Sequence, residues 1–151
     1  MALPVAKLPN LTHLHAAHNS LFDVSVLSNA VQLQELVISN NVLTDISSLY
    51  TLVNLTLLDF SYNDVTAIPA FDVSCALVTL NGEHNKVESI GALAGMRNLN
   101  YIYMDYNPID DITFLANCPS LIQVNVYGTE VSEDEVNALL DRSIIVNFDP
   151  T

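Results

Sequence analysis

Hydrophobic residues recur along this chain with a period of 22 residues, in register with a polar residue of the same period. The polar residue is asparagine, at Asn19, Asn41, Asn63, Asn85 and Asn107. Six hydrophobic columns accompany it, three before and three after each asparagine, as at Leu33, Leu36, Ile38, Leu43, Ile46 and Leu49. A fixed period of this length predicts a solenoid, in which each repeat packs on its neighbours.

Within each repeat, two hydrophobic positions ahead of the asparagine alternate with polar ones, as at Leu36 and Ile38. Alternation with period two predicts a short β-strand with one buried face. The chain must turn inward after this strand. Asparagine suits that bend, because its amide both donates and accepts hydrogen bonds to open backbone groups. We therefore interpret the five asparagines as a structural ladder.

The segment that follows each asparagine has hydrophobic residues three positions apart. This spacing predicts 3₁₀ or brief helical turns on the convex side of the solenoid. Three aspartates recur at one column ahead of these turns, Asp23, Asp45 and Asp111. We expect them to cap the turns, whereas Ala67 and Ser89 break the column.

Together the columns read L-x-x-L-x-L-x-x-N-x-L, and from about Val5 to Val131 the chain resembles leucine-rich repeat proteins. Segments such as 43–49 resemble the 22-residue subclass, which includes bacterial internalins and intracellular phosphatase regulators. The tail, 143–151, is similar to the closing segment of internalin-like proteins from Gram-positive gut bacteria. The resemblance implies an α/β solenoid with short parallel strands on the concave face and 3₁₀ or irregular turns on the convex face. A helix-and-strand cap is expected at the C-terminus.

Residues 1–151 are expected to form a single leucine-rich repeat domain of about five repeats plus a partial N-terminal repeat. Val5 and Leu8 fall where Leu27 and Ala30 fall one repeat later, so the sequence begins inside a repeat. We expect a piece of a longer protein without an N-terminal cap. An uncovered first strand also allows a dimer through this edge, with a monomer as the alternative.

The pattern changes at residues 128–151, which we interpret as the C-terminal cap. Gly128-Thr129 replaces the residue-plus-asparagine pair, so the ladder ends there. Ser132 and Glu135 have capping-box spacing and predict a helix. That helix is expected to cover the last coil through Val136, Leu139 and Leu140, with an interaction helix as the alternative. A terminal β segment is predicted over 143–148.

Charge narrows the possible partners. The chain has 17 acidic and 4 basic residues, for a net charge of −13. The basic residues form no cluster, so double-stranded nucleic acid and anionic membranes are poor partners. Acidity favours a basic protein partner, with simple solubility as the alternative. No hydrophobic run approaches the roughly 18 residues of a membrane span, and the first residues lack a secretory layout.

The two cysteines are predicted to be free thiols. Cys75 and Cys118 lie about two coils apart. Two strand spacings amount to roughly 10 Å, whereas a disulfide requires Cα atoms within about 7 Å. Free thiols do not indicate in which cellular compartment the protein is located.

Strand positions that alternate with the buried leucines are expected to face the open, concave side. Five of the six tyrosines and all four histidines fall there, and none of the four basic residues does. We predict a ligand-binding patch comprising Tyr62, Glu83, His84, Tyr101, Tyr103, Asp105, Tyr106 and Tyr127. Tyrosine offers large contact area with few torsions to order. The alternative is that tyrosine simply favours strands.

His13 and His15 face one way on a strand, and Glu35 stands beside them on the next strand. Such a trio is a weak candidate for a zinc site. Otherwise no metal site and no cofactor is predicted. Phosphate-loop, G-x-S-x-G and H-E-x-x-H motifs are absent from the sequence, which argues against an enzyme.

We therefore expect a protein-binding module, surface-displayed or secreted, that holds a protein ligand on its concave face in adhesion or recognition. An intracellular scaffold or phosphatase-regulator-type subunit is the alternative, and would place the chain in the cytoplasm. A carbohydrate-binding surface is a third hypothesis, because sugars also stack on aromatic rings.

Overall fold

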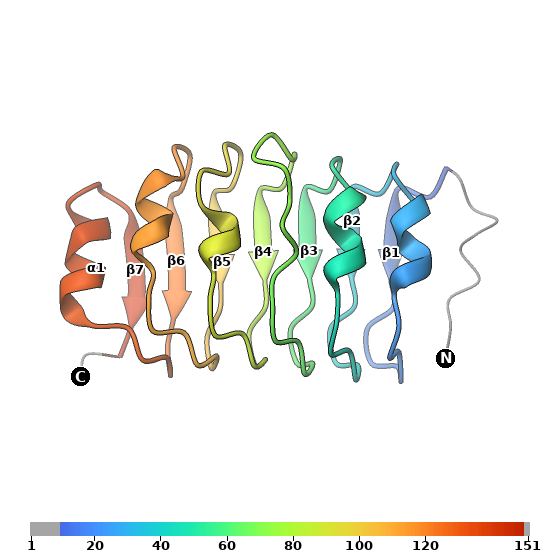
Figure 1. The fold of residues 1–151 in the computed structure, drawn as a ribbon, viewed down its shortest axis with the longest axis horizontal. Helices are drawn as coiled ribbons and strands as arrows, with labels where there is room; N and C mark the ends of the chain where they lie inside the picture. Colours follow the sequence, from blue (N-terminus) through green and yellow to red (C-terminus); the bar gives the residue numbers. More distant parts are fainter. Residues whose placement is uncertain (1–9, 150–151) are drawn as a thin grey trace.

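The computed structural model describes residues 10–149, which form a seven-stranded parallel sheet in chain order (Figure 1). The elements are β1 (His13–His15), η2 (Ser25–Asn29), β2 (Glu35–Val37), η3 (Ser47–Thr51), β3 (Leu57–Asp59), β4 (Thr79–Asn81), η4 (Gly91–Leu93), β5 (Tyr101–Tyr103), η5 (Thr113–Asn117), β6 (Gln123–Val126), α1 (Glu133–Leu140) and β7 (Ile145–Phe148). The η elements are 3₁₀ helices, and with α1 they lie along one face of the sheet. Each strand residue pairs with the residue 22 positions later, as Leu36 pairs with Leu58.

The strands alternate between buried and partly exposed positions, as the period of two predicted. The central residues of β2 to β6 are fully buried: Leu36, Leu58, Leu80, Ile102 and Val124. They face the η elements and form one continuous core with the hydrophobic columns of the return segments. The other strand side chains face away from the η elements, and we call this side the open face. The predicted solenoid is confirmed.

Side-chain size varies strongly in one column of the inner face, which reads Ala16, Ile38, Phe60, Gly82, Met104 and Val126. Phe60 and Met104 are fully buried and stand on either side of Gly82. A Cβ atom on Gly82 would lie 2.4 Å from Phe60 Cζ and 2.7 Å from Met104 Sδ. Glycine at this position therefore leaves the space that the phenylalanine ring occupies.

The asparagines tie neighbouring coils together, as the sequence predicted. Asn63 Nδ2 donates to the carbonyls of Phe60 and Ser61 in its own coil and of Ile38 in the preceding coil. Its Oδ1 accepts from Leu43 N at 3.0 Å. Asn41, Asn85 and Asn107 repeat this pattern. At the end of the ladder the Thr129 hydroxyl donates to Val126 O at 2.7 Å, which replaces one of these bonds.

The turn aspartates bond to the start of each 3₁₀ turn from the position before its N-cap. Asp23, Asp45 and Asp111 each accept from the backbone N–H two residues later, at 2.7 to 2.8 Å. That bond is the main cause that lowers the pKa of Asp23 and Asp45, whereas the Thr113 hydroxyl, and then the Thr113 N–H, lower the pKa of Asp111. Ser89 breaks the aspartate column but not its function, because its hydroxyl accepts from Gly91 N at 3.2 Å.

The third return segment departs from the predicted pattern. Between β3 and β4 the structure has turns in place of a 3₁₀ helix, and Asp72 accepts from Ser74 N at 2.8 Å. Pro69 lies in this segment and has no backbone N–H to donate. The core is nevertheless kept, because Phe71 and Cys75 are both buried.

The C-terminal cap forms largely as predicted. Ser132 and Glu135 make both bonds of a capping box at the start of α1, and β7 pairs with β6. Val136 and Leu139 are buried against the last coil. The prediction for Leu140 was wrong: its side chain is 45% exposed, because it lies about 100° around the helix from Leu139.

Both cysteines are free and buried, as predicted, and burial raises the pKa of each thiol. The helices between residues 10 and 149 are all too short or too polar to cross a membrane. The expectation of an uncapped first coil concerns residues 1–9, which lie outside the described residues.

Candidate functional site

The eight predicted ligand-binding residues all lie on the open face or along its margin. Tyr101 and Tyr103 belong to β5, and both are half-buried. The other members follow the strands: Tyr62, Glu83, His84, Asp105, Tyr106 and Tyr127. Among the tyrosines, Tyr62, Tyr106 and Tyr127 are the most exposed of this group, at 48%, 56% and 39%.

Three of these rings form a continuous stack. The centroid of His84 lies 4.3 Å from that of Tyr62 and 4.3 Å from that of Tyr106, with 20° between the ring planes in each pair. The spacing is close to the strand spacing of about 4.8 Å, so one ring from each coil meets the next. Stacking at this distance is favourable for aromatic rings. We call Tyr62, His84 and Tyr106 the aromatic stack.

A left-handed backbone conformation positions the stack. Tyr62, His84 and Tyr106 have φ of 54°, 52° and 57°, and the same column contains His18, Asn40 and Gly128 with φ of 55°, 54° and 62°. Such values are uncommon for residues other than glycine. Backbone bonds hold them here: the N–H of His84, for example, donates to Asp105 O at 2.8 Å. The turn places these side chains at the edge of the open face.

The aromatic stack ends on a glycine. A Cβ atom on Gly128 would lie 2.6 Å from Cδ1 and 2.9 Å from Cε1 of Tyr106. The ring therefore rests on the glycine backbone, and a side chain there would displace it. The sequence analysis took Gly128 only as the end of the asparagine ladder. Glycine in a column with Asn40, a residue that tolerates positive φ, was the available signal for this conformation.

Two carboxyl groups stand beside the stack on neighbouring coils. Asp105 is 8% exposed, and its Oδ1 accepts from Tyr127 N at 2.7 Å. Glu83 is half-buried in the same column. Burial first, and then the negative charge of Asp105, raise the pKa of Glu83. Burial also raises the pKa of Asp105, although the Tyr127 N–H bond opposes that shift. We call Glu83 and Asp105 the carboxyl pair.

Lysine and arginine are absent from the strands β1 to β7. Lys86 Nζ lies 2.6 Å from Asp64 Oδ1, so it pairs within the turns that follow the strands. Negative charges of Asp59 and Asp149 raise the pKa of Glu83 and Asp105, respectively, and the charge of His84 lowers both.

The candidate zinc site does not form. Glu35 Oε1 lies 2.6 Å from His15 Nε2, and Glu35 Oε2 lies 3.9 Å from His13 Nε2. The Nδ1 atom of His13 instead meets Thr12 Oγ1 at 2.9 Å. Within residues 10–149, no group of three histidine, cysteine or acidic side chains is arranged to hold a metal ion. The trio is an exposed hydrogen-bonded cluster at the start of the sheet.

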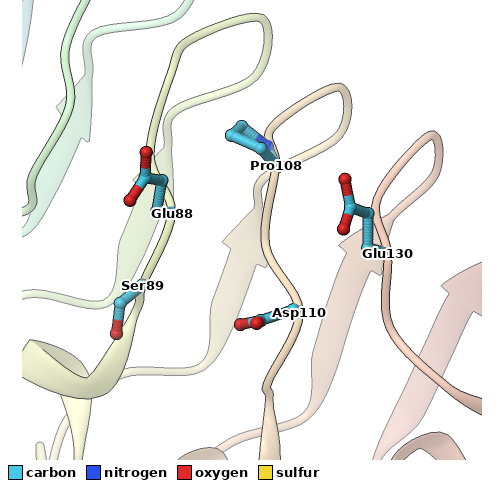
Figure 2. Close-up of a pocket in the computed structure, with 5 residues that line it drawn as sticks. All are labelled: Glu88, Ser89, Pro108, Asp110 and Glu130. Atoms are coloured by element: carbon cyan, nitrogen blue, oxygen red, sulfur yellow. The ribbon is translucent and has the colours of Figure 1, made fainter.

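A hollow of about 420 Å³ lies on the flank of the solenoid, and none of its lining residues belongs to the aromatic stack. Its lining residues are Glu88, Ser89, Pro108, Asp110 and Glu130, from three successive coils (Figure 2). Asp110 and Glu130 both point toward the preceding coil. The hollow is open to solvent, and its acids are exposed side chains of turns.

Comparisons with known proteins agree with this architecture. Residues 31–81 match the family model for leucine-rich repeats in two copies. Among solved structures, internalin C2 of Listeria monocytogenes is 27% identical with a TM-score of 0.73, over 96% of this chain and 74% of that one. An internalin F from the same organism is 26% identical with a TM-score of 0.66, over 97% of this chain and 51% of that one.

More distant structures show the same fold. A leucine-rich repeat protein of Leptospira interrogans is 20% identical with a TM-score of 0.85, over 97% of this chain and 40% of that one. A plant peptide hormone receptor, solved in complex with RGF2, is 23% identical with a TM-score of 0.75, over 96% of this chain and 26% of the receptor. No curated protein sequence matches the chain significantly. The fold is a leucine-rich repeat solenoid, which typically serves as a protein interaction module.

Proposed function

We propose that this chain is a recognition module that binds a protein ligand on its open face, and that it is secreted or displayed at a bacterial cell surface. The observation that carries the binding proposal is the collection of exposed tyrosines on one face: Tyr62, Tyr106 and Tyr127 are 48%, 56% and 39% exposed. Clustered aromatic residues of this kind dominate protein interfaces energetically. The surface location is supported by the similarity to two internalins.

The aromatic stack adds an argument from entropy. Each ring in it is held by a neighbouring ring at 4.3 Å. A ligand that contacts ordered side chains loses less conformational freedom on binding than one that must immobilise mobile ones. The open face therefore presents preformed contact area.

Selection from a displayed library of random peptides tests the binding proposal. Peptides selected on the wild-type chain are expected to lose on the order of a hundredfold in affinity for a Tyr103→Ala, Tyr106→Ala, Tyr127→Ala triple variant, because such residues act as hot spots. The matched control is a Phe22→Ala, Tyr50→Ala, Phe114→Ala triple, which removes three exposed rings outside the open face. Equal binding to wild type and to the tyrosine triple would place the hot spot elsewhere.

The location has its own test. An antibody raised against the chain should detect the protein in the culture medium or cell-wall fraction of the source organism. Detection confined to the cytosol would favour the scaffold or phosphatase-regulator reading.

A further inference from the structure

We propose that the carboxyl pair and the aromatic stack together dock an arginine side chain from a basic segment of the protein ligand. This inference rests on the proposed function and adds the chemistry of the partner. The guanidinium group bridges Glu83 and Asp105, and the rest of the ligand segment lies against the rings of the aromatic stack.

Charge complementarity carries the first step. Within residues 10–149, the ion pairs of the chain are those of Glu35 with the histidines and of Lys86 with Asp64, and neither reaches the carboxyl pair. Burial raises the pKa of both carboxyls; the negative charge of Asp105 raises that of Glu83 further, whereas a side-chain hydrogen bond from Glu83 lowers that of Asp105. A cation from a ligand would oppose the upward shifts, because an opposite charge favours the ionised form of each group.

Geometry favours arginine over lysine. The two carboxyls belong to the same column of successive coils, and their side chains are near enough to hydrogen-bond to each other. A guanidinium group is planar and donates along two edges at once, so it can bond to two neighbouring carboxylates. A lysine ammonium is a compact point charge without this fork.

The rings supply contact area beside that charge. Tyr62 and Tyr106 are 48% and 56% exposed, whereas Asp105 is 8% exposed. Exposed aromatic rings and a buried acid therefore occupy adjacent positions of the same coils. Partly desolvated charge pairs flanked by aromatic groups are typical of interface hot spots.

A titration followed by ¹⁵N–¹H NMR tests the inference with the probe acetyl-Gly-Arg-Gly-amide. The Tyr127 amide is the reporter, because its N–H donates directly to Asp105 Oδ1 at 2.7 Å. We expect saturable shifts at Glu83, Asp105 and Tyr127, and none with the citrulline counterpart, which is uncharged but nearly the same shape. Shifts spread evenly over the acidic surface, or equal shifts with citrulline, would overturn the inference.

Charge-matched variants give the second arm. Glu83→Gln with Asp105→Asn should weaken the arginine probe on the order of tenfold, through loss of charge-assisted hydrogen bonds. Asparagine keeps an oxygen for the Tyr127 N–H, and Glu83→Gln alone is a milder variant. Glu88→Gln with Asp110→Asn removes the same charge from the flank and should bind as wild type. Equal losses for both doubles would mean diffuse attraction and contradict the proposal.

Failure of this inference is distinguishable from failure of the proposed function. Selected peptides that need the tyrosines but bind the Glu83→Gln, Asp105→Asn variant normally would refute the arginine site alone. Peptides that ignore the tyrosines would refute the open face as the binding surface.

Discussion

The two faces of the same sheet follow different rules. On the inner face, all columns are hydrophobic and most repeat a similar side chain in every coil, such as the fully buried Leu36, Leu58 and Leu80. On the open face the column that contains the carboxyl pair changes at almost every step, as Ala17, Ser39, Ser61, Glu83, Asp105 and Tyr127. Repetition is what a stacked core needs, because each layer meets an equivalent layer. The stacked core does not require the variation along the open face.

Polar groups show the same contrast. The asparagine ladder and the turn aspartates have backbone partners, and those bonds lower the pKa of the aspartates. The carboxyl pair is partly desolvated and its pKa values are raised, even though Asp105 also accepts from the Tyr127 N–H. The asparagines and turn aspartates stabilise the folded chain, whereas the ionised carboxyl pair lowers its stability. The following predictions test this division, from the largest expected effect to the smallest.

The asparagine ladder should show the largest effect. Asn63→Ala leaves the Leu43 N–H without its partner, and one buried unsatisfied group costs about 1–3 kcal/mol. It also removes one of two donors from each of three carbonyls, which keep their bonds to Asn40 N, Asn41 Nδ2 and Asn85 Nδ2. We expect a loss of about 2–4 kcal/mol in the free energy of unfolding by urea. Asn19→Ala, whose amide donates to Ala16 and Ala17 of its own coil, should cost about 1 kcal/mol. Equal losses would mean that the bonds between coils add nothing.

The inner face should reject a single methyl group. Gly82→Ala places a Cβ 2.4 Å from Phe60 Cζ, and overpacking of this kind costs about 1–3 kcal/mol. Gly91→Ala is the control, because its nearest neighbour would lie 3.5 Å away, an ordinary contact. Adding Phe60→Leu to Gly82→Ala should recover part of the loss in thermal unfolding. No recovery would indicate backbone strain instead of the ring clash.

A turn aspartate should have a moderate effect that depends on pH. Asp111→Ala removes the acceptor of the Thr113 N–H and should cost about 0.5–1 kcal/mol at neutral pH. Because the folded pKa of Asp111 is lowered, its contribution is present above the unfolded pKa and is lost as pH falls through the folded pKa. Asp110→Ala, one residue earlier, controls for net charge. Unfolding curves at neutral and acidic pH measure the difference, which should shrink on acidification.

The carboxyl pair should show the smallest effect, with the opposite sign. Glu83 has a raised folded pKa, so its contribution is greatest below its unfolded pKa and is lost as pH rises through the folded pKa. Glu83→Gln should therefore stabilise the chain at neutral pH by less than about 1 kcal/mol, since the group is partly solvated. The gain should vanish in acid. A destabilised variant at neutral pH would assign Glu83 to the structural set.

Most of the architecture could be predicted from sequence, because a buried column repeats every 22 residues and leaves a visible pattern. The exposure of Leu140 was missed, because consecutive residues of the eight-residue helix α1 point about 100° apart, and this rotation moves the side chain from the core to solvent. The turns around Pro69 were missed because the hydrophobic spacing there still looked regular.

The candidate site was predicted in composition and not in arrangement. Periodicity put Tyr62, His84 and Tyr106 in one column but gave no backbone conformation. Only positive φ brings the rings face to face, and only the glycine at 128 leaves room for the last of them. The burial of Asp105 was also missed, because it depends on neighbouring coils and not on its own position in the repeat.

Tyrosine oxidation by hydroxyl radicals, with and without a selected peptide, tests the central claim most directly. Tyr106 on the open face and Tyr50 on η3 are 56% and 57% exposed, so one sample contains a matched pair. The account predicts that the peptide protects Tyr106 and Tyr62 from oxidation and leaves Tyr50 unchanged. Protection of Tyr50, with Tyr62 and Tyr106 still fully reactive, would contradict it.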